Sequence, residues 1–378
     1  MPEKILIISV SVLLFHYLFF IMKITRGLSK LRPNNNWGYK NLFVSVIIPF
    51  RNEENNLPEN AFSIQKVNFN PEKLEIIYVN DHSTDNSVEV LKSLVNSDNI
   101  KILSVPDDYS INAHKKRAIR FGIENSKGEI IVTSDADCTY NQNWLNSLLG
   151  NFDDETGFVS GPVKFKSEEK FFSQLQQLEF AGLVIVGAGL IGSGSPIICN
   201  AANIAYRKEA FNEVKGFNDN LNISSGDDEF LMQKISKSKK YKVKFSVNPD
   251  SFVETAANKN LNEFYHQRKR WASKGLFYNS KLLILRLVLI FLFFLSIILL
   301  PFTSAWFGKL SVYLFFISFL AKLIYEYLLL FKGKLVFFRD LSLKHFLIAE
   351  IFHIPYILIA GISGLFGNYL WKERRVPR

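Results

Sequence analysis

Residues 42–49 read Leu-Phe-Val-Ser-Val-Ile-Ile-Pro, a short run rich in β-branched residues that ends at a proline. A nearly continuous apolar run of this length is typical of a parallel strand buried on both faces. Further runs of the same kind lie at 75–79 (EIIYV), 100–105 and 129–134 (EIIVTS). Helix-like stretches separate them, at 53–67, 85–96 and 112–125. This alternation predicts an α/β domain with a doubly wound, Rossmann-like sheet.

Polar side chains follow three of these strands. The first strand runs into Pro49-Phe50-Arg51-Asn52-Glu53-Glu54, the second into Asn80-Asp81-His82-Ser83-Thr84-Asp85, and the fourth into Asp135-Ala136-Asp137. One acid at a strand end is usually a helix N-cap, which is the simplest interpretation of Asp85. Ligands of such sheets bind at the carboxyl ends of the strands. Three acidic strand ends on one edge therefore indicate a binding site.

Asp135 and Asp137 form the sharpest pair among these acids. Residues i and i+2 of an extended segment point to the same side, where two carboxylates repel each other unless a cation lies between them. A divalent metal with oxygen ligands removes that repulsion and can bridge a diphosphate. A DxD triplet alone occurs often by chance, but this one directly follows an apolar strand.

Two further segments place charge at expected helix starts. The basic run 114–117, which includes Lys115, opposes the helix dipole, so a nearby phosphate would explain it as well as a solvated basic face would. Asp227 and Asp228 lie at the start of another helix-like run, where acids are ordinary dipole partners. One of them could also accept the proton of an attacking hydroxyl group.

Long apolar segments flank the α/β region. Residues 5–22 carry no charge and can span a bilayer, with a cleaved signal peptide as the alternative. The basic residues after this run place the next domain in the cytosol; they are Lys23, Arg26, Lys30 and Arg32. Further spans are expected at 287–307, broken by Pro301, at 310–331 and at 346–370. In the third span, Lys322 and Glu326 lie four residues apart and are expected to pair as a structural element.

The basic tail 371–378 conflicts with four full spans, because those spans would leave it outside the cell. Either the last segment is re-entrant or interfacial, or the first helix sets the orientation of the protein in the membrane despite the basic tail. The net charge of +10 is concentrated beside the apolar segments, which favours membrane-surface charge over a nucleic-acid footprint. The 35 phenylalanines are also typical of lipid-facing helices. The two cysteines have no metal-site spacing and indicate a reducing compartment.

The pentad Gln267-Arg268-Lys269-Arg270-Trp271 is the most specific motif in the chain. A basic amphipathic helix at a membrane surface would explain its charges but not its spacing. With this QxxRW motif, the DxD and the opening VSVIIPFRNEE, residues 42–275 resemble the family 2 inverting glycosyltransferases of GT-A fold. The flanking helices resemble its membrane branch, which includes cellulose, chitin and hyaluronan synthases and bacterial lipid-linked or polysaccharide glycosyltransferases.

The resemblance implies roles for the strand-end residues. It places Pro49 and Glu53 near the nucleoside and Asp81 on the nucleobase, although Asn80 stands where the family often has another aspartate. Lys115 is implied near the diphosphate, with His114 in place of the usual glycine. Asp135 and Asp137 match the metal-binding motif for Mg²⁺ or Mn²⁺, and Asp137 is the implied direct ligand.

The resemblance also implies the catalytic groups. Asp228 matches the catalytic base, and Asp227 matches its accompanying acid. Gln267 opens the motif on an interfacial helix that covers the site, with Arg270 near the diphosphate and Trp271 near the acceptor sugar. The apolar stretch 171–195 is expected to be an interface helix plus a loop near the acceptor. Asn203 is expected either to touch the acceptor or to pack structurally.

These observations predict an integral protein of the bacterial inner membrane with a cytoplasmic GT-A domain at 42–280. Membrane segments are expected at 1–24 and 281–378, a linker at 25–41, and an interfacial helix near 260–280. The expected activity moves a sugar from a nucleotide-diphosphate sugar, with uridine as the implied base, to a lipid, lipid-linked or glycan acceptor. The alternatives are a processive polysaccharide synthase and a catalytically inactive nucleotide-binding scaffold. No nucleic-acid partner is expected.

Overall fold

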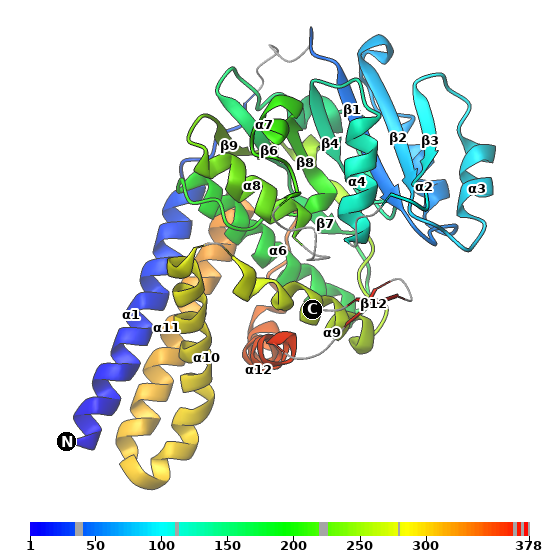
Figure 1. Cartoon of the computed structure of the whole chain (residues 1–378). Coiled ribbons are helices and arrows are strands. Elements are labelled where there is room, and N and C mark those ends of the chain that lie inside the picture. The colour runs from blue at the N-terminus through cyan, green and yellow to red at the C-terminus, as the bar shows by residue number, and fades with distance from the viewer. Residues whose placement is uncertain are drawn as a thin grey trace.

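The computed structural model describes residues 1–34, 41–109, 113–218, 226–278, 280–365, 369–371 and 374–376. An α/β domain lies at one end of a group of long helices (Figure 1). Its main sheet has seven strands in the order β3-β2-β1-β4-β8-β6-β9. They are β1 (Val44–Phe50), β2 (Leu74–Asn80), β3 (Ile100–Ser104), β4 (Ile130–Thr133), β6 (Thr156–Ser160), β8 (Ile204–Arg207) and β9 (Lys242–Phe245).

The first half of the sheet is parallel. β1 pairs in parallel with β2 and β4, and β2 pairs in parallel with β3. Every residue of β2 is buried, and only one position of β1 is partly exposed, which explains the nearly continuous apolar runs. The connecting helices are α2 (Leu57–Ile64), α3 (Ser87–Leu94) and α4 (His114–Glu124). The expected alternation of strands and helices in an α/β domain is confirmed.

The second half of the sheet is mixed. β8 pairs antiparallel with both β4 and β6, and β6 pairs in parallel with β9. A smaller sheet has the order β5-β10-β7, with β5 (Thr139–Tyr140), β7 (Val163–Phe165) and β10 (Val253–Thr255). The remaining elements of the domain are α5 (Trp144–Leu149), α7 (Lys208–Glu213) and α8 (Asp227–Lys237). The short strands β11 (Tyr369–Trp371) and β12 (Arg374–Val376) pair near the C-terminus.

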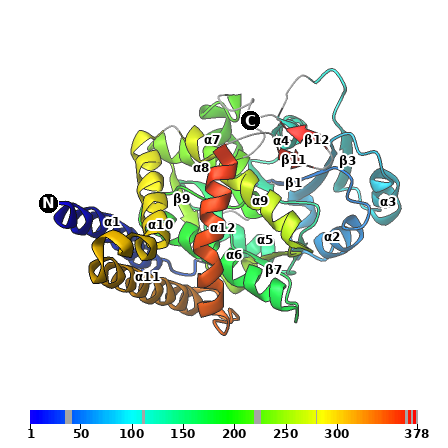
Figure 2. The same ribbon diagram turned by 90° about the horizontal axis from the view of Figure 1, so that it is seen from below.

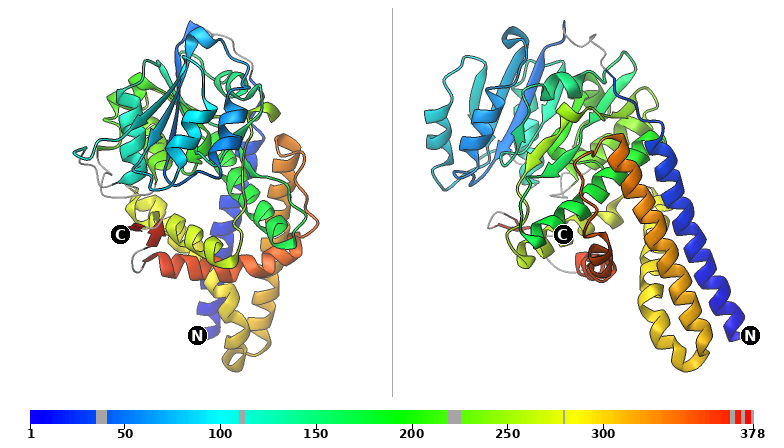
Figure 3. Two further views of the ribbon diagram at one scale, coloured as in Figure 1. Left: turned by 90° about the vertical axis from the view of Figure 1, so that its right-hand side faces the viewer. Right: turned by 180° about the vertical axis from the view of Figure 1, so that it is seen from behind.

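Three long helices lie side by side and extend away from the domain: α1 (Pro2–Leu28), α10 (Lys281–Phe307) and α11 (Lys309–Val336) (Figures 1 and 3). Helix α12 (Phe346–Leu365) runs crosswise to them and is seen along its length in Figure 2. It lies against α9 (Leu261–Ser273). This crosswise direction favours the interfacial alternative for the segment after 346 over a fourth parallel span. Part of the basic tail lies outside the described residues.

Five helices within the described residues are long and apolar enough to cross a membrane. They are α1, α6 (Phe171–Gly192), α10, α11 and α12. Of the 18 consecutive residues that form the most apolar part of α6, 56% are buried inside the protein, compared with 17% for the corresponding part of α1. The protein is therefore a membrane protein in which α6 packs mainly against other parts of the chain.

Helix α10 continues through Pro301, so the expected break in this span is wrong. Proline removes one backbone donor, so only the Ile297 carbonyl, four residues earlier, loses its usual partner. The next turn carries additional hydrogen bonds, because Thr303 Oγ1 donates to the Leu300 carbonyl at 2.9 Å and Ser304 Oγ donates to the Pro301 carbonyl at 2.6 Å.

Glycines allow α1 and α6 to touch through their backbones. A Cβ atom on Gly27 would lie 1.9 Å from the carbonyl oxygen of Gly189, and one on Gly189 would lie 2.4 Å from Ile24 Cγ2. Small residues permit this close approach between membrane helices. The first membrane helix is thus joined tightly to a helix of the α/β domain.

A buried charge cluster joins α1, α11 and α12. Lys322 Nζ lies 2.9 Å from Glu326 Oε2, as the spacing of four residues predicts, and it also pairs with Glu350. His353 Nδ1 lies 3.4 Å from the same ammonium group, and the Tyr17 hydroxyl donates to Glu326. Glu326, Glu350 and His353 could offer ligand atoms to a metal, but the Lys322 ammonium already lies among them.

Candidate active site

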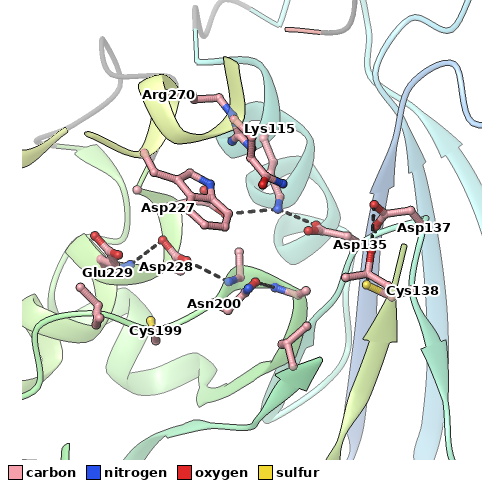
Figure 4. Close-up of a pocket in the computed structure, with 18 of the residues that line it drawn as sticks. Lys115, Asp135, Asp137, Cys138, Cys199, Asn200, Asp227, Asp228, Glu229 and Arg270 are labelled. Atoms are coloured by element: carbon pink, nitrogen blue, oxygen red, sulfur yellow. Dashed lines mark hydrogen bonds and ion pairs between the residues drawn. The ribbon is translucent and has the colours of Figure 1, made fainter. Parts of the chain in front are cut away.

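A cavity of about 470 Å³ lies where the strand ends, the start of α8 and helix α9 meet (Figure 4). Its lining includes every site residue that the sequence predicts. They are Pro49, Glu53, Asp81, Lys115, Asp135, Asp137, Asp227, Asp228, Gln267, Arg270 and Trp271. The structure therefore brings together segments more than two hundred positions apart, while the individual roles stay predictions.

The loops after β1 and β2 interlock at one end of the cavity. Asn52 and His82 both adopt left-handed backbone conformations, with φ of 50° and 60°. The Asn52 side chain accepts a hydrogen bond from the Thr84 backbone at 2.9 Å. Non-glycine residues in this region are strained and persist only where the surroundings hold them, as they often do at functional sites. Asn80 accepts a hydrogen bond from the Ser83 backbone at 2.9 Å and so shapes the second loop.

Asp81 is buried beside a guanidinium group. Arg117 of α4 donates from Nε to Asp81 Oδ1 at 3.1 Å, and its Nη2 contacts the same oxygen. His82 Nδ1 lies 3.6 Å from that oxygen and extends the cluster. Arg117 belongs to the basic run 114–117, but nothing in the sequence distinguishes it from its neighbours as the partner of Asp81.

Lys115 connects the strand-end acids to α8. Its Nζ lies 2.5 Å from Asp135 Oδ1 and 3.9 Å from Asp227 Oδ2 (Figure 4). Burial alone would lower the pKa of Lys115, but the two carboxylates outweigh burial and hold the pKa above its usual value. Part of the negative charge expected near the start of α4 is thus supplied by Asp135 and Asp227 of the chain itself.

Asp135 and Asp137 fit a divalent cation. Both line the cavity from the loop after β4, and Asp137 Oδ2 also accepts a hydrogen bond from Thr255 Oγ1 of β10 at 3.2 Å. Carboxylate oxygens are the ligands that Mg²⁺ and Mn²⁺ prefer.

Gly226 sets the position of the acids on α8. It has φ of +79°, and a Cβ there would lie 2.7 Å from the Phe230 ring. Asp228 follows in the first turn, where Oδ2 accepts from the Ala201 backbone at 2.8 Å and Oδ1 accepts from the Glu229 backbone at 2.7 Å. Burial raises the pKa of Asp228, Lys274 acts in the opposite direction, and Asp227 raises it further. A raised pKa suits a group that must accept a proton.

Lys274 and Tyr278 are site residues that sequence reasoning missed. Lys274 Nζ lies 3.0 Å from Glu229 Oε1, and the Tyr278 hydroxyl donates to Glu229 Oε2 at 2.6 Å. Burial raises the pKa of Glu229 to about 7, with Lys274 opposing and Asp228 adding to the rise. Both partners come from the segment just after QxxRW, and no recognised spacing marks them.

Helix α9 covers the cavity with its motif residues. Arg270 lies on the same side of the cavity as Lys115 in Figure 4. The Trp271 ring lies 6.0 Å from the Phe180 ring of α6, measured between centroids. Gln267 accepts a hydrogen bond from Asn258 Nδ2 at 3.0 Å. The predicted interfacial helix therefore has its motif facing the cavity.

One wall of the cavity is apolar. Phe180, Leu183, Val184 and Gly187 of α6 line it, together with Ile198 from the following loop. Leu183 remains 37% exposed, so this wall can contact a bound molecule. Asn203, in contrast, is fully buried and donates to the carbonyls of Pro162 and Ser251 at 2.7 and 2.8 Å. Of the two expected roles of Asn203, these contacts support structural packing.

Residues 45–215 match the family model described as Glycosyl transferase family 2. The poly-beta-1,6-N-acetyl-D-glucosamine synthase of Staphylococcus aureus strain MSSA476 is 23% identical over 268 residues, covering 68% of this chain and 60% of the relative. The synthase of the same name from Staphylococcus epidermidis is 22% identical over 242 residues, covering 61% of this chain and 54% of the relative. The chain thus spans 60% or less of the length of these relatives.

Among solved structures, the mannosyltransferase PcManGT from Pyrobaculum calidifontis, in complex with GDP-Man and Mn²⁺, is similar over most of the chain. The TM-score is 0.60 and the sequence identity is 17%, with 97% of this chain and 99% of that chain covered. At this identity, the similarity is one of fold.

Proposed function

We propose that this protein is a membrane-anchored inverting glycosyltransferase, and the match of residues 45–215 to the model described as Glycosyl transferase family 2 supports this proposal. It transfers a sugar from a nucleoside diphosphate sugar to a lipid-linked or glycan acceptor. The observation that carries this proposal is the shared cavity, in which the strand-end acids, Asp228 and the QxxRW residues lie together.

In the proposed mechanism, the donor lies along the strand ends and the acceptor hydroxyl lies beside Asp228. Asp228 accepts the hydroxyl proton as the acceptor oxygen attacks the sugar carbon, and the bond from that carbon to the diphosphate breaks. Lys115 and Arg270 line the same cavity, and in this mechanism their charges offset the negative charge on the leaving diphosphate. Asp135 and Asp137 would hold a divalent cation, which supplies further positive charge to the diphosphate when bound.

The apolar wall of α6 supports a lipid-linked acceptor. It lies in the same cavity as Asp228 and belongs to a helix that packs directly on the membrane helix α1. An acceptor with an acyl or isoprenoid chain could leave its polar head beside the base and its chain along α6. The basic residues at the end of α1 and just after it support a cytoplasmic orientation of the domain in a bacterial cell membrane.

A processive polysaccharide synthase is the second candidate, and two observations favour it: the QxxRW motif and the names of the curated relatives. The three parallel long helices within the described residues favour single transfer, since a conducting channel for a polymer usually needs more helices. Product length on a gel, from purified protein and labelled donor, separates the two activities.

The test is a donor panel with the full-length protein in detergent. UDP-N-acetylglucosamine, UDP-glucose and GDP-mannose are supplied with Mn²⁺, with Mg²⁺ or with EDTA, and nucleotide release and sugar transfer are measured. We expect one uridine-linked donor to be used, and we expect EDTA to abolish its use. Absence of release and transfer with all donors and metals would support the inactive scaffold instead.

A further inference from the structure

Arg268 lies inside the QxxRW pentad at a position that the motif leaves open. Its neighbours Gln267, Arg270 and Trp271 line the cavity, whereas Arg268 is only 4% exposed and contacts α6. An arginine is rarely buried unless its charge is paired and its donors are used. The contacts of Arg268 therefore show what this buried charge holds in place.

The Arg268 guanidinium touches two motif side chains at once. Its Nη1 donates to Gln267 Oε1 at 2.7 Å, and its central carbon lies 4.3 Å from the centre of the Trp271 ring. The Phe264 ring, one turn earlier, lies 4.5 Å from the same carbon. A planar guanidinium between aromatic rings restricts the orientation of both rings.

Glu179 of α6 and Tyr356 of α12 fix the guanidinium in turn. Arg268 Nη2 pairs with Glu179 Oε2, and the Tyr356 hydroxyl donates to Glu179 Oε1 at 2.5 Å. Both oxygens of the Glu179 carboxylate are thus used within a partly buried network. The Tyr356 ring also packs edge-on against Phe264, with centroids 5.5 Å apart. The three helices α6, α9 and α12 meet at this network.

Helix α6 holds Gln267 by a second route. Gln176 Oε1 accepts from the Asn258 side chain at 2.9 Å, and the same Asn258 amide donates to Gln267 Oε1 at 3.0 Å. Gln176 and Glu179 lie three residues apart on one face of α6. The orientation of Gln267 is therefore set by α6 through both Asn258 and Arg268.

We propose that Arg268, Glu179 and Tyr356 are positioning residues that orient Gln267 and Trp271 toward the acceptor. This inference rests on the proposed glycosyl transfer and adds a role for α12, the crosswise helix, as a support of the active site. Small displacements of groups that orient a substrate reduce transfer strongly while leaving remote binding contacts intact. The nucleoside is expected at the ends of β1 and β2 and not at α9, so effects on nucleotide binding and on transfer can be separated.

The experiment uses the full-length protein in detergent and compares Tyr356→Phe, Glu179→Gln and the double variant with wild type. Tyr356→Phe removes one hydroxyl and keeps the ring, and Tyr313→Phe on the exposed face of α11 is the matched control. Arg268→Lys keeps the charge but loses the planar group. The readouts are kcat and acceptor KM for transfer, the Kd of UDP, and the thermal midpoint.

We expect each single variant to lower kcat/KM for the acceptor by about tenfold or more, the range for lost hydrogen bonds to charged groups. The Kd of UDP should change by less than about twofold, and the double variant should be no worse than the poorer single one, because both act through Arg268. Arg268→Lys should also lower transfer, because the charge alone does not replace the planar guanidinium group.

Three outcomes would overturn the inference: wild-type transfer in the variants, additive effects in the double variant, or parallel losses of transfer, UDP binding and thermal midpoint. The last outcome would indicate a role in folding alone. If the wild-type protein itself transfers no sugar, the proposed function fails instead, so the two failures are distinguishable.

Discussion

Asp228 is the side chain on which the proposed chemistry depends most directly. Both of its oxygens are oriented by backbone N–H groups, and burial raises its pKa above the usual value of a carboxyl group. Asp228→Asn keeps the shape and removes the proton acceptor, so we expect kcat to fall by about 10²–10⁴. Steady-state transfer kinetics measure the change. Asp154→Asn, at an exposed position, is the control, and near wild-type transfer by Asp228→Asn would refute the assignment.

Lys274 gives a prediction about pH. Burial raises the pKa of Asp228, and Lys274 is the main group that lowers it. The base works when deprotonated, so activity falls as the pH drops through this pKa. Lys274→Met removes the lowering charge, and the acid limb of the pH profile of kcat/KM should therefore move to higher pH. Lys269→Met, on helix α9 just before Lys274, is the control, and an unmoved limb or a shift to lower pH would contradict the prediction.

At the scale of elements, the contact between α1 and α6 determines how the membrane anchor and the α/β domain are joined. The glycines at this crossing leave no space for a Cβ, since one on Gly189 would lie 2.4 Å from Ile24 Cγ2. Gly189→Ala should lower the free energy of unfolding by about 1–3 kcal/mol through overpacking. Thermal unfolding in detergent measures this loss.

Gly182 offers a matched control on the same helix. A Cβ there would meet Leu330 at 3.6 Å, which is ordinary contact. Because alanine favours helix over glycine by about 1 kcal/mol, Gly182→Ala should be neutral or stabilising. Equal thermal midpoints for the two variants would show that the helices do not pack as closely as the structure has them.

At the scale of the whole molecule, the Lys322 cluster holds the crosswise helix α12 on α11, and Tyr17 links α1 to it. Lys322→Met leaves two buried carboxylates without their cation, which destabilises proteins by about 3–5 kcal/mol. The thermal midpoint in lipid nanodiscs should fall clearly. Lys309→Met, at an exposed position of the same helix, should leave it unchanged.

The same cluster allows a second comparison. Adding Glu326→Gln and Glu350→Gln to Lys322→Met removes the unpaired charges, so the triple variant should recover part of the loss. A triple variant that is less stable than Lys322→Met would mean that the carboxylates stabilise the fold independently of the lysine.

Local patterns predicted much of this protein correctly. The apolar runs identified β1 to β4, and the connecting helices were placed within a few residues of their observed bounds. The short motifs identified the residues that line one cavity. Strand burial, helix length and motif spacing are properties of neighbouring residues, which is why they can be read from the sequence. Pro301 predicts a break in α10, whereas the helix continues through it, because the proline removes only the one backbone hydrogen bond to the Ile297 carbonyl.

Composition and spacing along the chain are enough to predict the fold class, the membrane segments and the set of candidate site residues. Four features become visible only in the folded chain: the antiparallel place of β8, the crosswise direction of α12, the pairing of Lys274 with Glu229 and the network around Arg268. These features join residues far apart in the chain. Their contacts depend on how the sheet, α6 and the membrane helices pack, which no local pattern encodes.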